Sequence, residues 1–148
     1  MTARALASGP SGRFTLLAAI AGVHAMASSL EQTDWPRVVH LYDRLLAVWN
    51  TPVVALNRAA AVSFADGPAA ALPLLDELAT DPRLADYPYL PATRADMLRR
   101  LGDAAGAAQS YRRAMEFTAN AAERAFLEQR LAEVGRAAGV EPGYHKRY

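Results

Sequence analysis

Cysteine is absent from the 148 residues, which excludes disulfides and thiolate metal sites and suits a reducing compartment. An excess of charge of either sign is also lacking, since 16 Lys and Arg against 15 Asp and Glu leave a formal net charge of +1. Proteins that bind bare duplex DNA present a basic face to it. We therefore expect no direct contact with nucleic acid.

Long apolar runs are missing as well. The most apolar stretch, residues 14–27, is too short to cross a bilayer. The N-terminus has no charged region followed by an apolar segment and a small-residue cleavage site, so no signal peptide is predicted. These features lead us to expect a cytoplasmic protein without membrane contact.

Signatures of catalysis or metal binding are equally scarce. The three histidines, His24, His40 and His145, have no partners at metal-ligand spacing. Glycine-rich phosphate loops are missing, and no serine has the flanking glycines of a nucleophile elbow. We expect no catalytic residue, no metal ion and no cofactor, and hence a protein that is not an enzyme.

What the chain does contain is a helical pattern, clearest in residues 91–117. Gly102 and the following aspartate predict a tight turn between two helices. Ala95 lies on the inner face of the first helix, and Ala107, Tyr111 and Ala114 share one face of the second. Small residues at Ala95 and Ala107 let antiparallel helices approach closely. This pattern resembles a tetratricopeptide repeat.

Two weaker copies lie upstream in the same register. The first comprises Thr33, Asp34, Trp35, Val38, Tyr42 and Leu45, and the second comprises Asp66, Gly67, Ala71, Leu75 and Leu78. The turns at residues 33, 66 and 102 are separated by about the 34 residues typical of this repeat. The sequence therefore predicts an all-α fold of about seven helices, in antiparallel pairs stacked as a short right-handed solenoid.

Three segments are expected along the chain: a linker remnant over residues 1–12, a helical domain over 13–138 and a flexible tail over 139–148. The first helix, residues 13–28, is apolar almost all round, which predicts that it is well buried. Thr33 is the expected N-cap of the second helix, and Thr51 followed by Pro52 is the expected start of the third.

The later helices have their own boundary signals. The fourth should follow residues 66–68 and run through Leu78, with Pro73 causing a bend or a late start. Residues 80–91 carry three prolines and are expected to be irregular. Asn120 should cap a last helix with one apolar edge, at Ala125 and Phe126, and one charged face that closes the array.

Several polar residues fall on helices that would line the concave face of such an array. One hypothesis is a partner-binding groove in which Asn57, Arg94 and Arg99, or Arg100 beside it, hold a partner's backbone or carboxylates. The favoured interpretation of Arg58 and Asp96 is instead an ion pair between repeats.

The aromatic residues of the repeat have a structural interpretation. Trp35 and Tyr42 occupy the packing positions of the repeat and are interpreted as core. Tyr111 has the corresponding place in the third copy.

A longer pattern runs through residues 4–134. The short sequences DW, LYD, LNRA, GPAA, RAD and LGD follow one another in this order. Together they resemble the tetratricopeptide-like C-terminal extension of extracytoplasmic-function RNA polymerase sigma factors. The residues that match are Trp35, Tyr42, Asp43, Asn57, Arg58, Arg94, Ala95 and Asp96.

The resemblance implies a regulatory domain fused behind two DNA-reading sigma modules. Its expected partners are those modules, core RNA polymerase or both. No helix-turn-helix with a basic recognition helix can be placed in the 148 residues, so DNA reading would belong to the modules alone.

An alternative of a different class is a sensor that binds a small metabolite between its helices. Such a pocket requires aromatic side chains around a few polar groups, which Trp35, Tyr87 and Tyr89 could supply. The groove residues favour the first hypothesis, and the aromatic residues favour the second.

Overall fold

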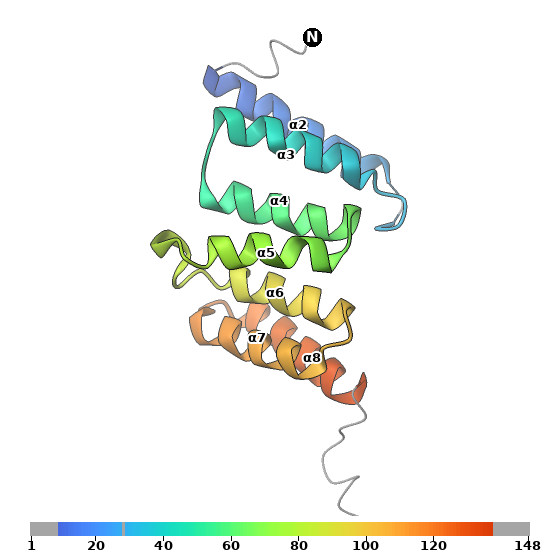
Figure 1. The fold of residues 1–148 in the computed structure, drawn as a ribbon, viewed down its shortest axis with the longest axis vertical. Helices are drawn as coiled ribbons and strands as arrows, with labels where there is room; N and C mark the ends of the chain where they lie inside the picture. The colour runs from blue at the N-terminus through green and yellow to red at the C-terminus, as the bar shows by residue number, and fades with distance from the viewer. Residues whose placement is uncertain (1–8, 28, 138–148) are drawn as a thin grey trace, which may run out of the picture. The chain divides into compact units, whose positions relative to one another are not determined.

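The computed structural model describes residues 9–27 and 29–137, which are helical and contain no strand. Its seven α-helices and one 3-10 helix are α2 (Gly9–Met26), α3 (Trp35–Val48), α4 (Pro52–Ala65), α5 (Pro68–Leu78), η1 (Pro82–Leu84), α6 (Tyr89–Arg100), α7 (Ala104–Phe117) and α8 (Ala121–Ala137) (Figure 1). The prediction of an all-α fold with about seven helices is confirmed.

The chain divides into two compact units, Met1–Asp81 and Pro82–Tyr148. In the first, α2 packs on α3, α3 on α4 and α4 on α5; in the second, α6 packs on α7 and α7 on α8. Within each unit successive helices run antiparallel (Figure 1), as predicted for a helical repeat. A single domain over 13–138 and the handedness of the stack stay predictions.

Side-chain caps determine where most of these helices begin. Each cap oxygen accepts the backbone N–H of the residue three positions later. Asp34 accepts from Arg37 (3.2 Å), Thr51 from Val54 (3.1 Å), Asp103 from Gly106 (2.9 Å) and Asn120 from Glu123 (3.0 Å). Each cap satisfies one of the N–H groups that a helix start leaves without an internal acceptor. The predictions for Thr51 and Asn120 are confirmed.

The predicted cap at Thr33 is wrong. Its hydroxyl donates to the Ser29 carbonyl (3.1 Å), and the side chain is buried. Asp34, one residue later, caps α3 instead. Both residue types make good caps, but the Thr33 hydroxyl is engaged by the preceding turn, which leaves Asp34 to cap the helix.

Glycines with positive φ make the turns within two helix pairs. Gly102 has φ +85° and joins α6 to α7, and Gly67 has φ +96° and joins α4 to α5. Residues with a Cβ disfavour this region of backbone space. The predicted turn at Gly102 is confirmed.

The repeat frame forms the core of each unit. In the first unit Val38 and Leu45 are fully buried beside Leu16 of α2, and in the second Ala95 and Ala107 are fully buried against each other's helices. The second cluster continues with Tyr111, Ala114, Leu127 and Val134. The predicted close approach of two helices at small residues is thereby confirmed.

Helix α2 differs from its prediction in two ways. It begins at Gly9, inside the predicted linker, and it is not well buried. Phe14 is 61% exposed and Met26 is 91% exposed, while Leu16 and Ile20 face the core. The reason is that α3 is its main packing partner in this unit, so one face is covered and the other is open.

Two helix starts and one helix face differ from their predictions. Helix α6 begins at Tyr89, so Pro91 lies in its first turn, where a missing N–H costs nothing. Pro73 lies inside a helix that already starts at Pro68, so the late start is wrong. On α8 the buried edge is Leu127 and Val134, whereas Phe126 is 53% exposed. The predicted tail, residues 139–148, lies outside the described residues.

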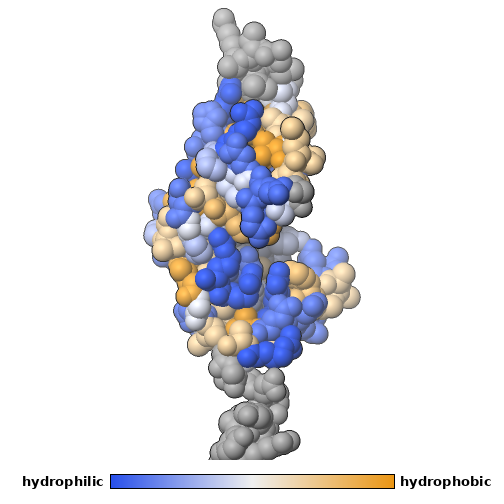
Figure 2. Space-filling view, turned by 90° about the vertical axis from the view of Figure 1, so that its right-hand side faces the viewer, coloured by the Kyte–Doolittle hydropathy of each residue, from blue (hydrophilic) through white to orange (hydrophobic). Residues whose placement is uncertain are grey.

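The surface carries scattered apolar side chains. Figure 2 shows one face on which hydrophobic residues form separate patches among hydrophilic ones. Within the described ranges, no helix combines the length and the apolar character that a membrane crossing needs.

Candidate functional site

Asn57, the central residue of the predicted groove, lines a cavity in the first unit. The cavity measures about 500 Å³ and is lined by Leu17, Tyr42, Leu45, Trp49, Thr51, Val53, Val54 and Asn57. We call it the Asn57 cavity. Its walls come from α2, the C-terminal half of α3 and the first turns of α4. The end of α3 and the start of α4 lie together because a short connection joins them.

Few polar groups enter the Asn57 cavity, and none of its lining residues is acidic. The Asn57 side chain is exposed, so its amide is open to a ligand as both donor and acceptor. Burial raises the pKa of Tyr42 above its ordinary value of 10.0, so its phenol stays protonated well beyond neutral pH. The Thr51 hydroxyl is already engaged in capping α4.

A cation lies beside this cavity. The Arg13 guanidinium carbon is 4.7 Å from the centre of the Trp49 ring and 5.1 Å from that of Phe14, both within cation–π range. Arg13 is one helical turn before Leu17, and both Leu17 and Trp49 line the cavity. In the described part of the chain no carboxylate contacts Arg13, and its Nε is buried without a hydrogen-bond acceptor.

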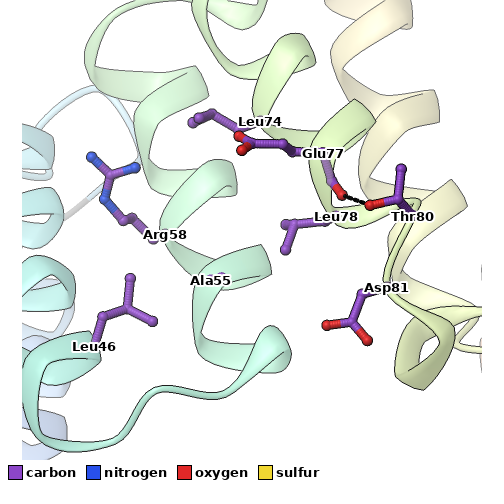
Figure 3. A pocket seen from close by; sticks show the side chains of 8 residues that line it. All are labelled: Leu46, Ala55, Arg58, Leu74, Glu77, Leu78, Thr80 and Asp81. Carbon is purple, nitrogen blue, oxygen red and sulfur yellow. Dashed lines mark hydrogen bonds between the residues drawn. The ribbon is translucent and has the colours of Figure 1, made fainter.

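A second, more polar cavity of about 420 Å³ lies between α3, α4, α5 and the residues that follow α5. Its lining contains Leu46, Ala55, Arg58, Leu74, Glu77, Leu78, Thr80 and Asp81. Figure 3 shows Arg58 and Asp81 on opposite sides of the hollow, and the Thr80 hydroxyl donating to the Glu77 carbonyl (2.7 Å). Its charged lining residues are two acids, Glu77 and Asp81, and one base, Arg58.

The predicted ion pair between Arg58 and Asp96 is wrong. The Arg58 Nε donates to the Asp43 carboxylate of α3, within the first unit. Asp96 pairs with Arg99, one turn along α6 in the second unit (2.7 Å). The acid that reaches each arginine is the one on its own or the adjacent helix, which a repeat pattern alone does not specify.

Arg99 is therefore held by its own unit. Besides the pair with Asp96, its Nε donates to the Tyr111 hydroxyl (3.4 Å), which also lies 3.4 Å from Asp96. The hydrogen bond that Arg99 donates to Asp96 is the largest cause of the raised pKa of Arg99. Burial raises the pKa of Tyr111 and lowers that of Arg100. This cluster ties α6 to α7 and is structural.

The three predicted groove residues do not all lie in one unit. Asn57 belongs to α4 in the first unit, and the half-buried Arg94 and Arg99 belong to α6 in the second. A single groove shared by all three stays a prediction. The geometry of the first unit supports Asn57 as a binding residue.

The second unit has a cavity of its own, about 300 Å³, which we call the Tyr89 cavity. It is lined by Pro88, Tyr89, Ala92, Thr118, Ala122, Glu123, Phe126 and Leu127. The Tyr89 hydroxyl is hydrogen-bonded to the Glu123 carboxylate, which raises the pKa of that phenol. The Tyr87 ring meets that of Tyr89 edge-on at 5.2 Å.

The two apolar cavities occupy equivalent places relative to a helix cap. Counted from Thr51, the Asn57 cavity is lined by the second, third and sixth residues after the cap. Counted from Asn120, the Tyr89 cavity is lined by the same three positions. The occupants are Val53, Val54 and Asn57 in one case and Ala122, Glu123 and Phe126 in the other. The chain therefore has two pockets at equivalent positions, and their lining side chains differ in chemistry.

Trp35 acts as a packing residue, as predicted. Its ring stacks on Phe64 at 4.5 Å and meets His24 edge-on at 5.2 Å, and its indole N–H donates to the Leu30 carbonyl (2.9 Å). His24 is exposed rather than buried, although its ring contacts that of Trp35.

Within the described residues no three His, Cys, Asp or Glu side chains gather in a way that could hold a metal ion.

Comparison with known proteins gives one informative relative. An uncharacterized protein of Rhizobium meliloti (strain 1021) is 41% identical over 120 residues, which are 81% of this chain. The matched stretch is only 28% of that relative, so the chain spans about a quarter of its length. No family model and no solved structure matches the chain.

Sequence reasoning missed Arg13, Leu17 and Trp49 as site residues. Arg13 and Leu17 were assigned to a buried helix, and Trp49 only marks the end of α3. The spacing of four between Arg13 and Leu17 does place them on one face. Only the packing of α2 on α3 brings that face to Trp49.

Proposed function

We propose that this chain is a regulatory protein-interaction domain of an extracytoplasmic-function sigma factor. It docks on the sigma modules or on core RNA polymerase and does not bind DNA itself. The observation that carries the proposal is the Asn57 cavity, an open apolar pocket with an exposed amide, built into a helical array of a kind that recognises protein segments.

Three further observations support this proposal. The residues of the sigma-factor resemblance include Tyr42 and Asn57, two of the residues that line the cavity. The relative from Rhizobium meliloti is much longer than the matched region, as a domain fused to other modules requires. The near-neutral charge fits a protein partner better than a polyanion. A cytoplasmic location follows from the proposed partners.

The test is capture of purified sigma modules and purified core polymerase, separately, by the immobilised 148-residue chain. Val53→Asp should abolish capture, because it places a charge in the wall of the cavity, where Val53 is 38% exposed. An acid is well tolerated in the first turn of a helix, so α4 should still form.

Ala69→Asp is the matched control. Ala69 holds the same position in α5 that Val53 holds in α4, directly after the helix-initiating proline, and it is exposed. The control should capture as the wild type does. Absence of capture by the wild-type chain would refute the proposed function.

A second candidate, a small-metabolite sensor, is favoured by the Tyr89 cavity. Its lining combines Tyr89, Phe126 and aliphatic carbons, and its one carboxylate, Glu123, is engaged by Tyr89. Small aromatic and aliphatic compounds would be titrated into the ¹⁵N-labelled chain. Saturable shifts of amides around Tyr89 that disappear in Phe126→Ala would establish this function.

A further inference from the structure

We infer that the Asn57 cavity receives one apolar side chain of an extended segment that also carries an acidic residue next to it. Asn57 holds the backbone of that segment, and Arg13 holds the carboxylate. This inference rests on the proposed function and specifies the chemistry of the partner.

The size and lining of the cavity favour an apolar side chain as the group that binds in it. About 500 Å³ lies within the roughly 300–1,000 Å³ typical of ligand-sized pockets. Leu17, Leu45, Val53 and Val54 contribute aliphatic surface, and Trp49 contributes an aromatic ring. An aliphatic or aromatic side chain buries apolar area against these residues.

The Asn57 amide favours binding to the peptide backbone of the partner segment. One carboxamide can accept an N–H and donate to a C=O, which matches the two groups that an extended peptide presents on one edge. Tyr42 adds a neutral phenol to the wall of the same cavity. A hydrocarbon without polar groups would leave both residues without partners.

The charge of the site selects an acid. Arg13 is fixed against the Trp49 ring at 4.7 Å, so its guanidinium is held in place before a ligand arrives. It has no acidic partner in the described part of the chain, and no acid lines the cavity. The first turn of α4, which forms one wall, adds the positive end of a helix dipole.

The equivalent cavity of the second unit shows that this preference is not a property of the repeat itself. There the position of Val54 is taken by Glu123 and that of Asn57 by Phe126. A carboxylate and an aromatic ring at these positions provide neither a free amide nor a complement to an acid. The acid-flanked segment is thus expected at the Asn57 cavity alone.

The experiment titrates two short synthetic peptides into the ¹⁵N-labelled 148-residue chain. Both contain one phenylalanine in a Gly-Ser background, flanked by aspartates in the first and by lysines in the second. We expect the aspartate peptide to shift the Asn57 side-chain amide and the Trp49 indole N–H. The Trp35 indole, bonded to Leu30, is the internal reference and should not move.

Two variants and a control test whether the charge of the site sets its preference between the two peptides. Arg13→Glu and Asn57→Asp should each lower the affinity for the aspartate peptide by about tenfold or more, since each replaces a favourable contact by a repulsive one. Arg13→Glu should also improve binding of the lysine peptide. Arg37→Glu makes the same charge change on the exposed start of α3, about 18 Å along that helix from Trp49, and should leave both affinities unchanged.

The outcomes separate this inference from the proposed function. Equal affinity for the two peptides, or shifts without involvement of Trp49 and Asn57, would overturn the inferred site. Binding of free N-acetylphenylalanine as tight as that of the aspartate peptide would also overturn it, in favour of a small ligand. Peptide binding as expected, without capture of sigma modules or polymerase, would keep the site and refute the proposed partner.

Discussion

Gly102 makes the turn between α6 and α7 with a φ of +85°, and a Cβ built there would meet nothing within 4 Å. The demand at this residue is therefore one of backbone conformation and not of space. Gly102→Val should lower the free energy of unfolding by about 1–3 kcal/mol, because a β-branched residue resists positive φ. Urea denaturation followed by circular dichroism measures this loss.

Gly22 is the matched control for this prediction. It lies within α2, also with open space around a built Cβ, but without positive φ. Gly22→Ala should stabilise the chain by about 0.5–1 kcal/mol, since alanine loses less conformational entropy in a helix. Unchanged stability of Gly102→Val would show that the turn does not require glycine.

Tyr111 gives the stability of the chain a dependence on alkaline pH. Burial raises its pKa above the ordinary value of 10.0, so the folded state binds the phenolic proton more tightly than the unfolded state. The stability linked to this difference is complete below about pH 10 and is lost as the pH rises through the raised folded value. Tyr42 is shifted in the same direction.

The Tyr111→Phe variant should accordingly lose less stability than the wild type when the pH rises from about 9 to about 11. At neutral pH the two should differ little, because the hydrogen bonds of the hydroxyl to Arg99 and Asp96 are long, at 3.4 Å. Urea midpoints at both pH values provide the measurement. Parallel losses in the two proteins would assign the alkaline sensitivity to other groups.

At the scale of secondary-structure elements, α6 and α7 are held together at small residues. Ala95 and Ala107 are both 0% exposed and belong to one core cluster. Ala107→Leu should destabilise the second unit by about 1–3 kcal/mol, because the extra atoms force the two helices apart. The measurement is the urea-unfolding free energy.

Ala105 on the same helix is exposed and serves as the comparison. Ala105→Leu should change stability by less than about 0.5 kcal/mol, since surface substitutions rarely do more. If both leucine variants had the stability of the wild type, close helix packing at Ala107 would not be needed.

At the scale of the whole molecule, a net charge of +1 gives little electrostatic drive toward DNA. Binding to a duplex depends on release of counterions by clustered lysines and arginines. Many arginines are also already paired within the fold, as Arg58 is with Asp43 and Arg113 with Glu116. The chain should not change the fluorescence anisotropy of labelled promoter DNA, even at low salt.

The positive control is a truncated polymerase subunit with a known basic DNA-binding face, which should raise the anisotropy and so show that the assay detects binding. Tight and strongly salt-dependent binding by the present chain would contradict the proposal that DNA reading belongs to separate modules. It would also require a basic surface that the charge balance does not suggest.

Features that depend on residues close together in the chain could be predicted from the sequence. The caps at Thr51 and Asn120, the glycine turns and the buried faces of α3 and α7 all follow from interactions across three or four positions. The repeat register placed Ala107 and Tyr111 in the core for the same reason. Caps and turns depend on residues a few positions apart, and the spacing of apolar residues indicates which face of a helix can be buried, so these features could be predicted.

Tertiary structure alone decided which helix faces meet and which charges pair. Arg58 reaches Asp43 across 15 residues, because the packing of α4 on α3 places that carboxylate within reach. Arg99 instead pairs with Asp96 of its own helix, a spacing of three that the sequence already contained. The open side of α2 and the meeting of Arg13 with Trp49 likewise depend on how α2 lies on α3. The residue pattern of α2 is apolar almost all round, and this led to the prediction that the helix is buried. Burial also requires a neighbouring element on each face, which depends on the fold.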